Sequence, residues 1–291
     1  MPLTSTRDFR VRHYECDLYG HVNNANYLRY MQEAAFDASA LAGYDTARYA
    51  AMGLLWLARE TQIDFLQPLR YGDTVEVKTW VSGFRGATSR RRYEIRRAGT
   101  GEAAATAHTD WVLLDAATLR PVRIPSGMAA AFFPEGVPAV SLPRDSFPEV
   151  PPAPPGTFKI RRRVALWEID PAGHVNNAAY LEYVEDCGMQ VIAAHGWPAA
   201  RMAEEGFAIV IRQHRIEYIQ PAVLDDELEI STWAFEVKRS SAQRHYAITR
   251  ISDGSRVARV NSLGVWMDLA TGRPIRIPPE FVQEFQPNLA S

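Results

Sequence analysis

The side chains best suited to chemistry lie in one short segment that occurs twice in the chain. Ten of the fourteen residues from Asp17 to Tyr30 recur in the same order from Asp170 to Tyr183. Each copy places an Asp, a Gly, a His and two Asn within eight residues. A carboxylate can attack an activated carbonyl carbon or direct water at it. N–H groups at a helix N-terminus can stabilise the oxyanion that forms. The segment therefore combines residue types that suit attack on an acyl group.

We expect the Asp, the His and the first Asn of each copy to take part in catalysis, namely Asp17, His21, Asn23, Asp170, His174 and Asn176. The second Asn and the following Tyr of each copy are expected to contact the substrate, namely Asn24, Tyr27, Asn177 and Tyr180. A backbone N–H near Asn23 or Asn24, and its counterpart near Asn176 or Asn177, would face the oxyanion.

An interpretation without catalysis uses the same residues. Asp and Asn before a helix are common caps and turn formers, and Gly20 can supply a positive φ. The two His would then orient the loop, the first Asn of each copy would bind loop backbone, and the two Tyr would form wall or core. The residue types alone leave both interpretations open.

The repeat continues along the chain at a constant offset of 153 residues. Arg59–Pro68 matches Arg212–Pro221, and Ala117–Pro125 matches Ala270–Pro278. Each repeat unit is about 120 residues long, which is the size of a small domain. The chain is therefore a tandem duplication of one fold rather than an array of short repeats.

A proline-rich segment separates the two copies. Eight of the 22 residues from Pro134 to Pro155 are proline, and such a composition is typical of a semi-rigid extended linker. We therefore predict a first domain over residues 1–133, a linker over 134–155 and a second domain over 156–291.

The elements that must position the loop are expected in the same order in both domains. A short β segment precedes the loop, at Phe9–Tyr14 and at Arg163–Trp167. A helix of about 16 residues follows, with apolar side chains at helical spacing, namely Leu28, Met31, Ala35, Ala38 and Leu41, then Leu181, Val184, Val191 and Ile192. Gly43 and Gly196 stand where each helix would end.

About four antiparallel strands are expected to complete each domain. Their inward side chains alternate along the sequence, as in Val75, Val77, Thr79 and Val81, and in Leu228, Ile230, Thr232 and Ala234. One long helix on one face of an antiparallel sheet is an α+β layer arrangement.

This order of elements, with D-x-x-G-H-V-N-N-x-x-Y before the helix, resembles the hotdog-fold thioesterases. The chain is most similar to the 4-hydroxybenzoyl-CoA thioesterase-like group and the double-hotdog acyl-ACP thioesterases. The resemblance implies a tandem hotdog, in which an antiparallel sheet wraps a central helix and two hotdogs pair to form sites. It also implies that the loop acid is the nucleophile or general base on the thioester of an acyl-CoA or an acyl carrier protein. Coenzyme A or phosphopantetheine would then belong to the substrate, and no metal or redox cofactor is expected.

The chain departs from the acyl-ACP branch at one position of the loop. That branch has an Asn two residues after the Asp, where Tyr19 and Ala172 stand here. An acyl-CoA substrate is therefore at least as consistent with the loop as an acyl carrier protein. A hotdog dehydratase or hydratase, and a non-catalytic acyl-binding module, are the alternative functions.

Glu60 and two arginines are further candidates. Some hotdog thioesterases use a Glu or Gln near the position of Glu60 to place water, and its counterpart here is Gln213. Arg90 and Arg92 belong to a basic stretch that could bind the phosphates of the substrate. The alternatives are a solvent-facing strand residue for Glu60 and solvated strand charge for the arginines.

Composition restricts the remaining possibilities. The net charge of −2 gives no indication of nucleic-acid binding, and two cysteines are too few for a disulfide framework. No apolar run reaches the roughly 18 residues of a membrane span, and the first residues lack the apolar core of a signal peptide. We expect a cytoplasmic protein without metal, membrane or nucleic-acid partners, which could form a homo-oligomer.

Overall fold

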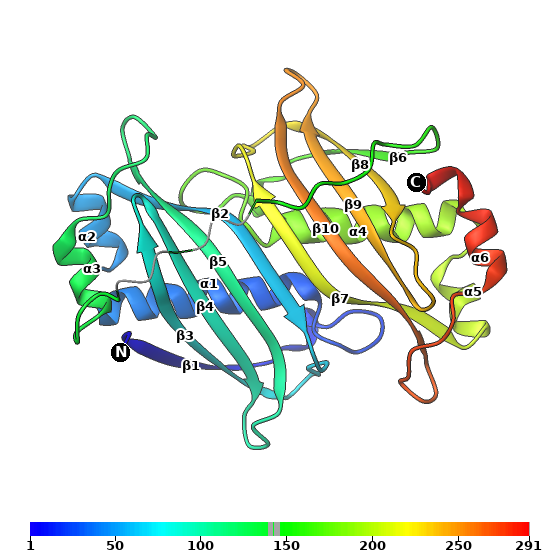
Figure 1. Ribbon diagram of the computed structural model, residues 1–291, viewed down its shortest axis with the longest axis horizontal. Coiled ribbons are helices and arrows are strands. Elements are labelled where there is room, and N and C mark those ends of the chain that lie inside the picture. The colour runs from blue at the N-terminus through cyan, green and yellow to red at the C-terminus, as the bar shows by residue number, and fades with distance from the viewer. Residues whose placement is uncertain (139–141, 143–145, 291) are drawn as a thin grey trace. The chain divides into compact units, whose positions relative to one another are not determined.

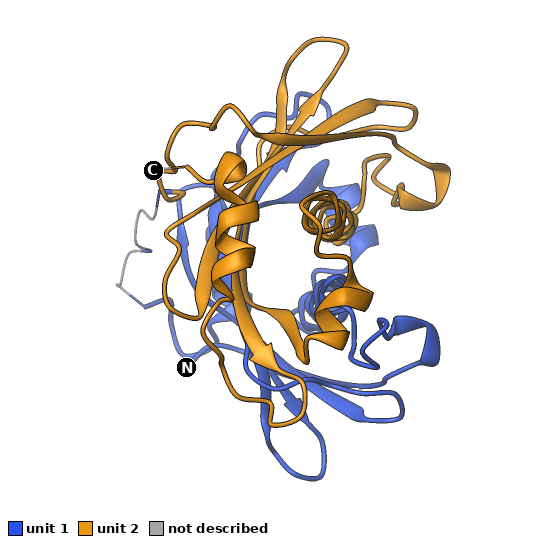
Figure 2. Cartoon of the chain, turned by 90° about the vertical axis from the view of Figure 1, so that its right-hand side faces the viewer, with its two compact units in different colours: residues 1–146 blue, residues 147–291 orange. Residues whose placement is uncertain are grey.

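The computed structural model describes residues 1–138, 142 and 146–290. The chain forms two compact units, Met1–Ser146 and Phe147–Ser291, which Figure 2 colours separately. The predicted linker includes residues 139–141 and 143–145, which lie outside the described residues, so its boundaries and those of the two domains stay predictions.

Unit 1 contains, in chain order, β1 (Thr4–Arg10), η1 (His13–Glu15), α1 (Asn24–Leu41), α2 (Thr46–Ala51), β2 (Leu54–Phe65), β3 (Thr74–Arg85), β4 (Thr88–Arg97), β5 (Ala103–Asp115) and α3 (Ser126–Phe132). Unit 2 contains β6 (Phe158–Arg163), η2 (Leu166–Glu168), α4 (Ala179–Ala194), α5 (Ala199–Glu204), β7 (Phe207–Tyr218), β8 (Glu227–Phe235), β9 (Ser241–Arg250), β10 (Arg256–Asp268), α6 (Pro279–Glu284) and η3 (Gln286–Asn288).

Each unit is an antiparallel sheet with a long helix on one face. The strand order is β1-β3-β4-β5-β2 in unit 1 and β6-β8-β9-β10-β7 in unit 2, and every pair is antiparallel. In Figure 1 the strands of each unit run side by side in front of α1 or α4. This is the tandem hotdog of the α+β class that the sequence predicted.

Alternation in the central strands explains how the helix face of each sheet is buried. In β3 the side chains of Val75, Val77, Thr79 and Val81 are buried, and the residues that alternate with them are partly exposed. Leu228 and Ile230 of β8 repeat this arrangement. Because successive side chains point to opposite faces of a strand, one face of each sheet packs against its helix.

The two long helices follow their predicted apolar spacing. Leu28, Met31, Ala35 and Ala38 of α1 are buried, as are the four predicted positions of α4. Leu41 is 64 % exposed, contrary to the prediction, because it is the last residue of α1. Gly43 has a φ of 80°, and the corresponding Gly196 has a φ of 85°, as expected after a helix end.

The first strand of each unit lies earlier than the sequence predicted. β1 and β6 are edge strands of mostly polar residues, with every second side chain exposed. They give no apolar alternation to detect. The predicted segments Phe9–Tyr14 and Arg163–Trp167 begin at the last residues of β1 and β6 and run into the 3₁₀ turns η1 and η2. The short helices α2, α3, α5 and α6 were not predicted either.

Candidate active site

The loop before α1 is a tight turn that the Asp17 carboxylate helps to close. Oδ1 of Asp17 accepts hydrogen bonds from the N–H groups of Tyr19, at 2.8 Å, and His21, at 3.1 Å. The Asp17 N–H donates to the His21 carbonyl at 2.7 Å. Gly20 has a φ of 72°, which non-glycine residues adopt at a cost. Asp17 is exposed, and within the described part of the chain its Oδ2 accepts no hydrogen bond.

The same turn recurs in unit 2. Oδ1 of Asp170 accepts from the N–H of Ala172 at 2.9 Å, and the Asp170 N–H donates to the His174 carbonyl at 2.9 Å. Gly173 has a φ of 81°. In both units, therefore, one carboxylate oxygen shapes the loop and the carboxylate lies at the surface of that loop.

The two loop histidines differ in their surroundings. His21 is half-buried, and its pKa is lowered by burial and by the nearby Arg70 cation, with Asp17 acting in the opposite direction. The equivalent of Arg70 in unit 2 is Val223. Nδ1 of His174 is buried and has no hydrogen-bond partner among the residues that the structure describes. Because its pKa is lowered, His21 is the neutral imidazole at neutral pH and can accept a proton.

Asn23 and Asn176 hold loop and helix backbone. Oδ1 of Asn23 accepts from the N–H of Ala25 at 3.0 Å, and Oδ1 of Asn176 accepts from the N–H of Ala178 at 3.0 Å. Their own N–H groups donate to the carbonyls of Glu15 and Glu168, both at 2.8 Å.

These bonds decide which backbone donors suit an oxyanion. The N–H groups of Asn23 and Asn176 donate to loop carbonyls, so these two are the less suitable of the positions expected in each loop. Asn24, the first residue of α1, and Asn177 keep the role as candidates.

A buried glutamate anchors each loop from below, and sequence reasoning missed it. Glu15 is 5 % exposed. Its Oε2 accepts from the Tyr30 hydroxyl at 2.7 Å and from the Arg12 N–H at 2.7 Å. Burial and the hydrogen bond to Glu15 both raise the pKa of Tyr30. The Tyr30 hydroxyl therefore keeps its proton at neutral pH and donates it in a hydrogen bond to the Glu15 carboxylate.

Unit 2 keeps this anchor. Oε2 of Glu168 accepts from the Tyr183 hydroxyl at 2.8 Å and from the Ala165 N–H at 2.8 Å, and Arg162 forms an ion pair with it. Glu15 and Tyr30 are identical to their equivalents at the offset of 153 residues. That identity is a signal that could have identified both pairs.

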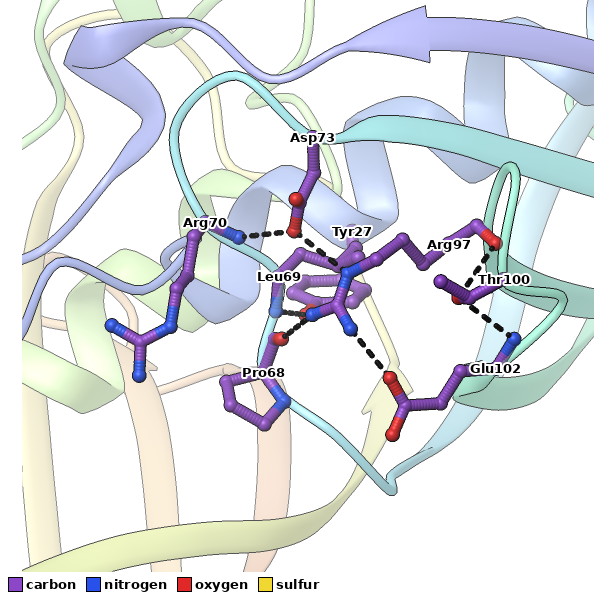
Figure 3. Close-up of polar contacts among 8 residues, drawn as sticks. All are labelled: Tyr27, Pro68, Leu69, Arg70, Asp73, Arg97, Thr100 and Glu102. Atoms are coloured by element: carbon purple, nitrogen blue, oxygen red, sulfur yellow. Dashed lines mark hydrogen bonds and ion pairs between the residues drawn. The ribbon is translucent and has the colours of Figure 1, made fainter.

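A second network fixes the segment that follows β2 beside the loop (Figure 3). Arg97 donates to Asp73 at 3.1 Å, to the Pro68 carbonyl at 2.8 Å and to Glu102 at 2.5 Å. The Arg70 N–H also donates to Asp73, at 2.9 Å. The bonds to Asp73 and to the Pro68 carbonyl have counterparts in unit 2, made by Arg250, Asp226 and Pro221.

Tyr27 and Tyr180 connect the helices to this segment. The Tyr27 hydroxyl accepts from the N–H of Leu69 at 3.3 Å, and the Tyr180 hydroxyl accepts from the N–H of Ala222 at 3.2 Å. Both rings are buried, and burial raises the pKa of Tyr180 to about 12. Tyr27 and Tyr180 therefore pack beneath the loop as buried structural residues.

Glu60 and the two arginines lie away from the loop of their own unit. Thr61 is on the helix side of the sheet, because it alternates in phase with Phe65, whose ring packs against Tyr27 of α1 with ring centroids 5.2 Å apart. Glu60 therefore points to the opposite face, next to its register partner Asp110.

Burial contradicts the alternatives for Glu60 and Arg90 but not for Arg92. Glu60 is 6 % exposed, so it is not a solvent-facing strand residue. Arg90 is 4 % exposed and forms a bidentate ion pair with Asp110 at 2.7 and 2.8 Å, so it is not solvated strand charge. Arg92 is exposed on the same face as Arg90. The structure does not bring these three residues to the Asp17 loop of unit 1.

No group of three or more His, Cys, Asp or Glu side chains in residues 1–138, 142 and 146–290 is arranged to hold a metal ion. Over the same residues, no helix has the length and apolar character to cross a membrane.

Curated relatives of the chain include chloroplastic enzymes of plants. A palmitoyl-acyl carrier protein thioesterase of Cuphea hookeriana is 26% identical over 191 residues, which is 62% of this chain and 46% of that protein. An acyl-acyl carrier protein thioesterase of Arabidopsis thaliana is 34% identical over 125 residues, which is 43% of this chain and 65% of that protein. The chain thus spans about half the length of the first of these relatives.

Solved structures share the whole architecture. A 12:0-ACP thioesterase from Umbellularia californica matches with a TM-score of 0.73 and 21% identity, over 91% of this chain and 94% of that one. An acyl-ACP thioesterase from Bacteroides thetaiotaomicron matches with a TM-score of 0.67 and 18% identity, over 90% and 97%. At this identity the likeness shows the fold.

The family assignment comes from a model that matches the chain twice. The model of the thioesterase-like superfamily covers residues 11–132 and 164–285, one copy in each unit. These ranges include both Asp loops, both long helices and every strand except the two edge strands β1 and β6. Because together they span well over half of the sequence, the chain belongs to the thioesterase-like superfamily.

Proposed function

We propose that the protein hydrolyses acyl thioesters to a free acid and a thiol, with Asp17 or Asp170 as the catalytic carboxylate. The observation that supports this most is the geometry of the two loops. Each carboxylate uses Oδ1 to hold a turn and lies on the surface of that turn, directly before a long helix. A residue that served only as a cap would need no second copy with the same Gly, His and Asn neighbours.

The chemistry proposed for each loop needs little beyond the described groups. The carboxylate attacks the thioester carbon or takes a proton from an attacking water. The proposed oxyanion donors are the N–H of Asn24, the first residue of α1, and the N–H of Asn177, in the turn before α4, both aided by the dipole of the helix. One such donor contributes about 3 kcal/mol to the transition state. The neutral His21 can accept a hydrogen bond from water or substrate.

The thiol of the substrate belongs to coenzyme A or to an acyl carrier protein. The names of the relatives favour the carrier protein. Tyr19 and Ala172, which replace the Asn of the acyl-ACP branch, favour coenzyme A. We propose acyl-CoA and acyl-ACP as alternative substrates, and a cytoplasmic location stays a prediction.

The first experiment separates the reaction classes. The full chain is incubated with a panel of acyl-CoAs and acyl-ACPs, and thiol release is followed with a thiol-reactive dye. Hydration of an enoyl-CoA is followed in parallel by absorbance, and ligand binding by calorimetry. Thiol release is the expected result. Hydration without thiol release would instead indicate a hydratase, and binding without either reaction would indicate an acyl-binding module.

A further inference from the structure

Unit 1 buries an arginine that has almost no polar partners. Arg91 of β4 is 5 % exposed and points to the helix side of the sheet, where its Nη2 donates to the Ser39 hydroxyl of α1 at 3.3 Å. In the described part of unit 1 this is its single hydrogen bond, and no carboxylate forms an ion pair with it. A guanidinium has five N–H donors. Burial lowers the pKa of Arg91.

Two more buried polar atoms adjoin this cation without a bonded acceptor. The Tyr93 hydroxyl and the Trp111 indole nitrogen are buried and have no hydrogen-bond partner among the described residues. Burial raises the pKa of Tyr93, and Arg91, Trp111 and Thr109 act in the opposite direction, so these groups lie around one hydroxyl. Unmet buried donors are costly, and native proteins keep few of them. The cluster is therefore suited to a ligand that brings acceptor oxygens.

In the second repeat the equivalent arginine has ordinary structural hydrogen-bond partners. Arg244, the equivalent of Arg91, donates to Asn288 Oδ1 at 2.9 Å and to the Thr232 hydroxyl at 3.4 Å. Asn288 is itself fully bonded, to the carbonyls of Gly156 and Thr232. Unit 2 thus supplies its buried arginine with an amide oxygen that two further hydrogen bonds hold in place, whereas the described part of unit 1 supplies Arg91 with the Ser39 hydroxyl alone.

The side chains around the two arginines also differ in how many hydrogen-bond donors they carry. Four positions near Arg91 carry a hydroxyl or an indole N–H, namely Ser39, Tyr49, Trp56 and Trp111. Their equivalents at the offset of 153 residues carry no side-chain donor, namely Ile192, Met202, Ile209 and Gly264. Side-chain donors are therefore more numerous around Arg91, whose printed acceptor is the Ser39 hydroxyl, than around Arg244.

The place of the cluster along α1 indicates which part of a substrate would reach it. Ser39 lies fifteen residues after Asn24, so Arg91 is about 22 Å along the helix from the end that follows the Asp17 loop. A group bound there is remote from a thioester at that loop. The cluster would meet the far end of a long acyl chain.

We propose that Arg91 binds a carboxylate at the far end of the acyl group, so that unit 1 selects thioesters of long-chain dicarboxylic acids. A carboxylate matches the planar guanidinium with two parallel hydrogen bonds. It also supplies lone pairs for the Tyr93 hydroxyl and the Trp111 N–H. The inference rests on the proposed thioester hydrolysis and assigns Arg91 as a specificity-determining residue.

The kinetic test compares substrates that differ only at the far end. Hexadecanoyl-CoA, 16-hydroxyhexadecanoyl-CoA and hexadecanedioyl-CoA are assayed for thiol release, with shorter pairs of eight and twelve carbons beside them. The wild-type chain should have a kcat/KM for the diacid thioester at least about tenfold above that for the plain acyl thioester. Arg91→Met should abolish this ratio, and the matched control Arg244→Met should keep it. A wild-type preference for the plain chain, or an unchanged ratio in Arg91→Met, would overturn the proposal.

A binding test does not depend on catalysis. Calorimetry with free dodecanedioate and dodecanoate should show tighter binding of the diacid to the wild-type chain and no such difference for Arg91→Met. If no thioester is cleaved but this difference is found, the proposed reaction fails and the carboxylate site stands. Equal binding of the two acids would remove the site.

The melting temperatures of the variants without ligand distinguish a ligand-binding arginine from one that stabilises the fold. Replacing an unpaired buried cation with an apolar side chain of similar length is neutral or stabilising. Arg91→Met should therefore melt at the wild-type temperature or above it, and Arg244→Met should melt lower because Asn288 loses its partner. A lower melting temperature for Arg91→Met would show that the guanidinium supports the fold and would contradict the proposal.

Discussion

At the scale of single residues, the loop aspartates and the buried glutamates have different roles. The aspartates are available for chemistry and the glutamates anchor the loops, a distinction that the sequence alone could not make. Asp17 and Asp170 are at the surface of their turns, whereas Glu15 and Glu168 are buried beneath them. An Asp before a helix usually caps it, but here the caps belong to other residues. Asn23 caps α1, and Asn176 holds the first backbone turn before α4. The Asp side chains hold only their own short turns.

The tyrosines under the loops make a prediction about stability. Tyr30→Phe and Tyr183→Phe each remove a buried hydroxyl that donates to a carboxylate at 2.7 and 2.8 Å. Loss of such a bond leaves the carboxylate underbonded, so each variant should lose about 1–3 kcal/mol of unfolding free energy. Urea unfolding measures this. Tyr71→Phe, at an exposed position, is the control and should show no loss. Wild-type stability in both buried variants would contradict the anchoring role.

A buried histidine makes a prediction about pH. Burial lowers the pKa of His245 from 6.5 to about 4, partly offset by its hydrogen bond to Asn261 at 2.6 Å. The unfolded chain takes up this proton below pH 6.5, and the folded chain takes it up only below about 4. Unfolding therefore gains a proton between these values, and stability falls as the pH falls through that window. The loss should be about 3 kcal/mol.

Chemical denaturation at pH 7 and at pH 4.5 tests this effect. The wild-type chain should lose stability relative to His245→Gln as the pH falls, because glutamine keeps a hydrogen-bond donor but does not titrate. A stability difference between the two proteins that stays constant with pH would show that His245 does not carry the effect.

At the scale of elements, the turn before each long helix decides where the carboxylate lies. Gly20 and Gly173 have φ values of 72° and 81°, and a Cβ at either would meet nothing within 4 Å. The requirement for glycine is therefore conformational rather than steric. The helix then begins at a fixed distance from the turn, because Asn23 and Asn176 bond to Glu15 and Glu168.

Alanine at these glycines should weaken the loops. Gly20→Ala and Gly173→Ala should each cost about 1–2 kcal/mol, the price of a left-handed conformation for an L-residue, and should lower thiol release by displacing the carboxylate. Gly127→Ala is the matched control, since Gly127 lies in α3 and also has open space around it. That change should be neutral or stabilising. Equal effects of all three changes would mean that the loop conformation does not depend on glycine.

Much of the element order could be predicted from the sequence, and the misses have two physical causes. The long helices and central strands carry strong apolar periodicity, as at Met31 and Ala35 in α1 and at Val75 and Val77 in β3. The edge strands β1 and β6 are half exposed and mostly polar, so their pattern is that of a loop. Glu60 could not be placed because facing depends on register, and β2 has an irregularity between Ala58 and Glu60.

At the scale of the whole molecule, the duplication allows each position to be compared with its equivalent in the other unit. Positions that are identical at the offset of 153 residues mark the shared framework, such as Glu15, Tyr30 and Arg97 with their counterparts. Positions that differ mark where the two units have separated, such as Arg70 against Val223 and Trp111 against Gly264. The sequence could predict the first set. It could not predict the state of Arg91, because burial and missing partners are visible only in three dimensions.

The central claim is that a loop carboxylate performs thioester hydrolysis, and single-turnover thiol release from an acyl-CoA tests it most directly. The measurement compares Asp17→Asn, Asp170→Asn, the double variant and the control Asp45→Asn, whose exposed carboxylate only caps α2. Asparagine keeps the turn-forming oxygen and removes the base. The double variant should be slower by roughly a hundred- to ten-thousandfold, with Asp45→Asn unchanged, and the two single variants should show which unit works. Thiol release at the wild-type rate from a folded double variant would contradict the account.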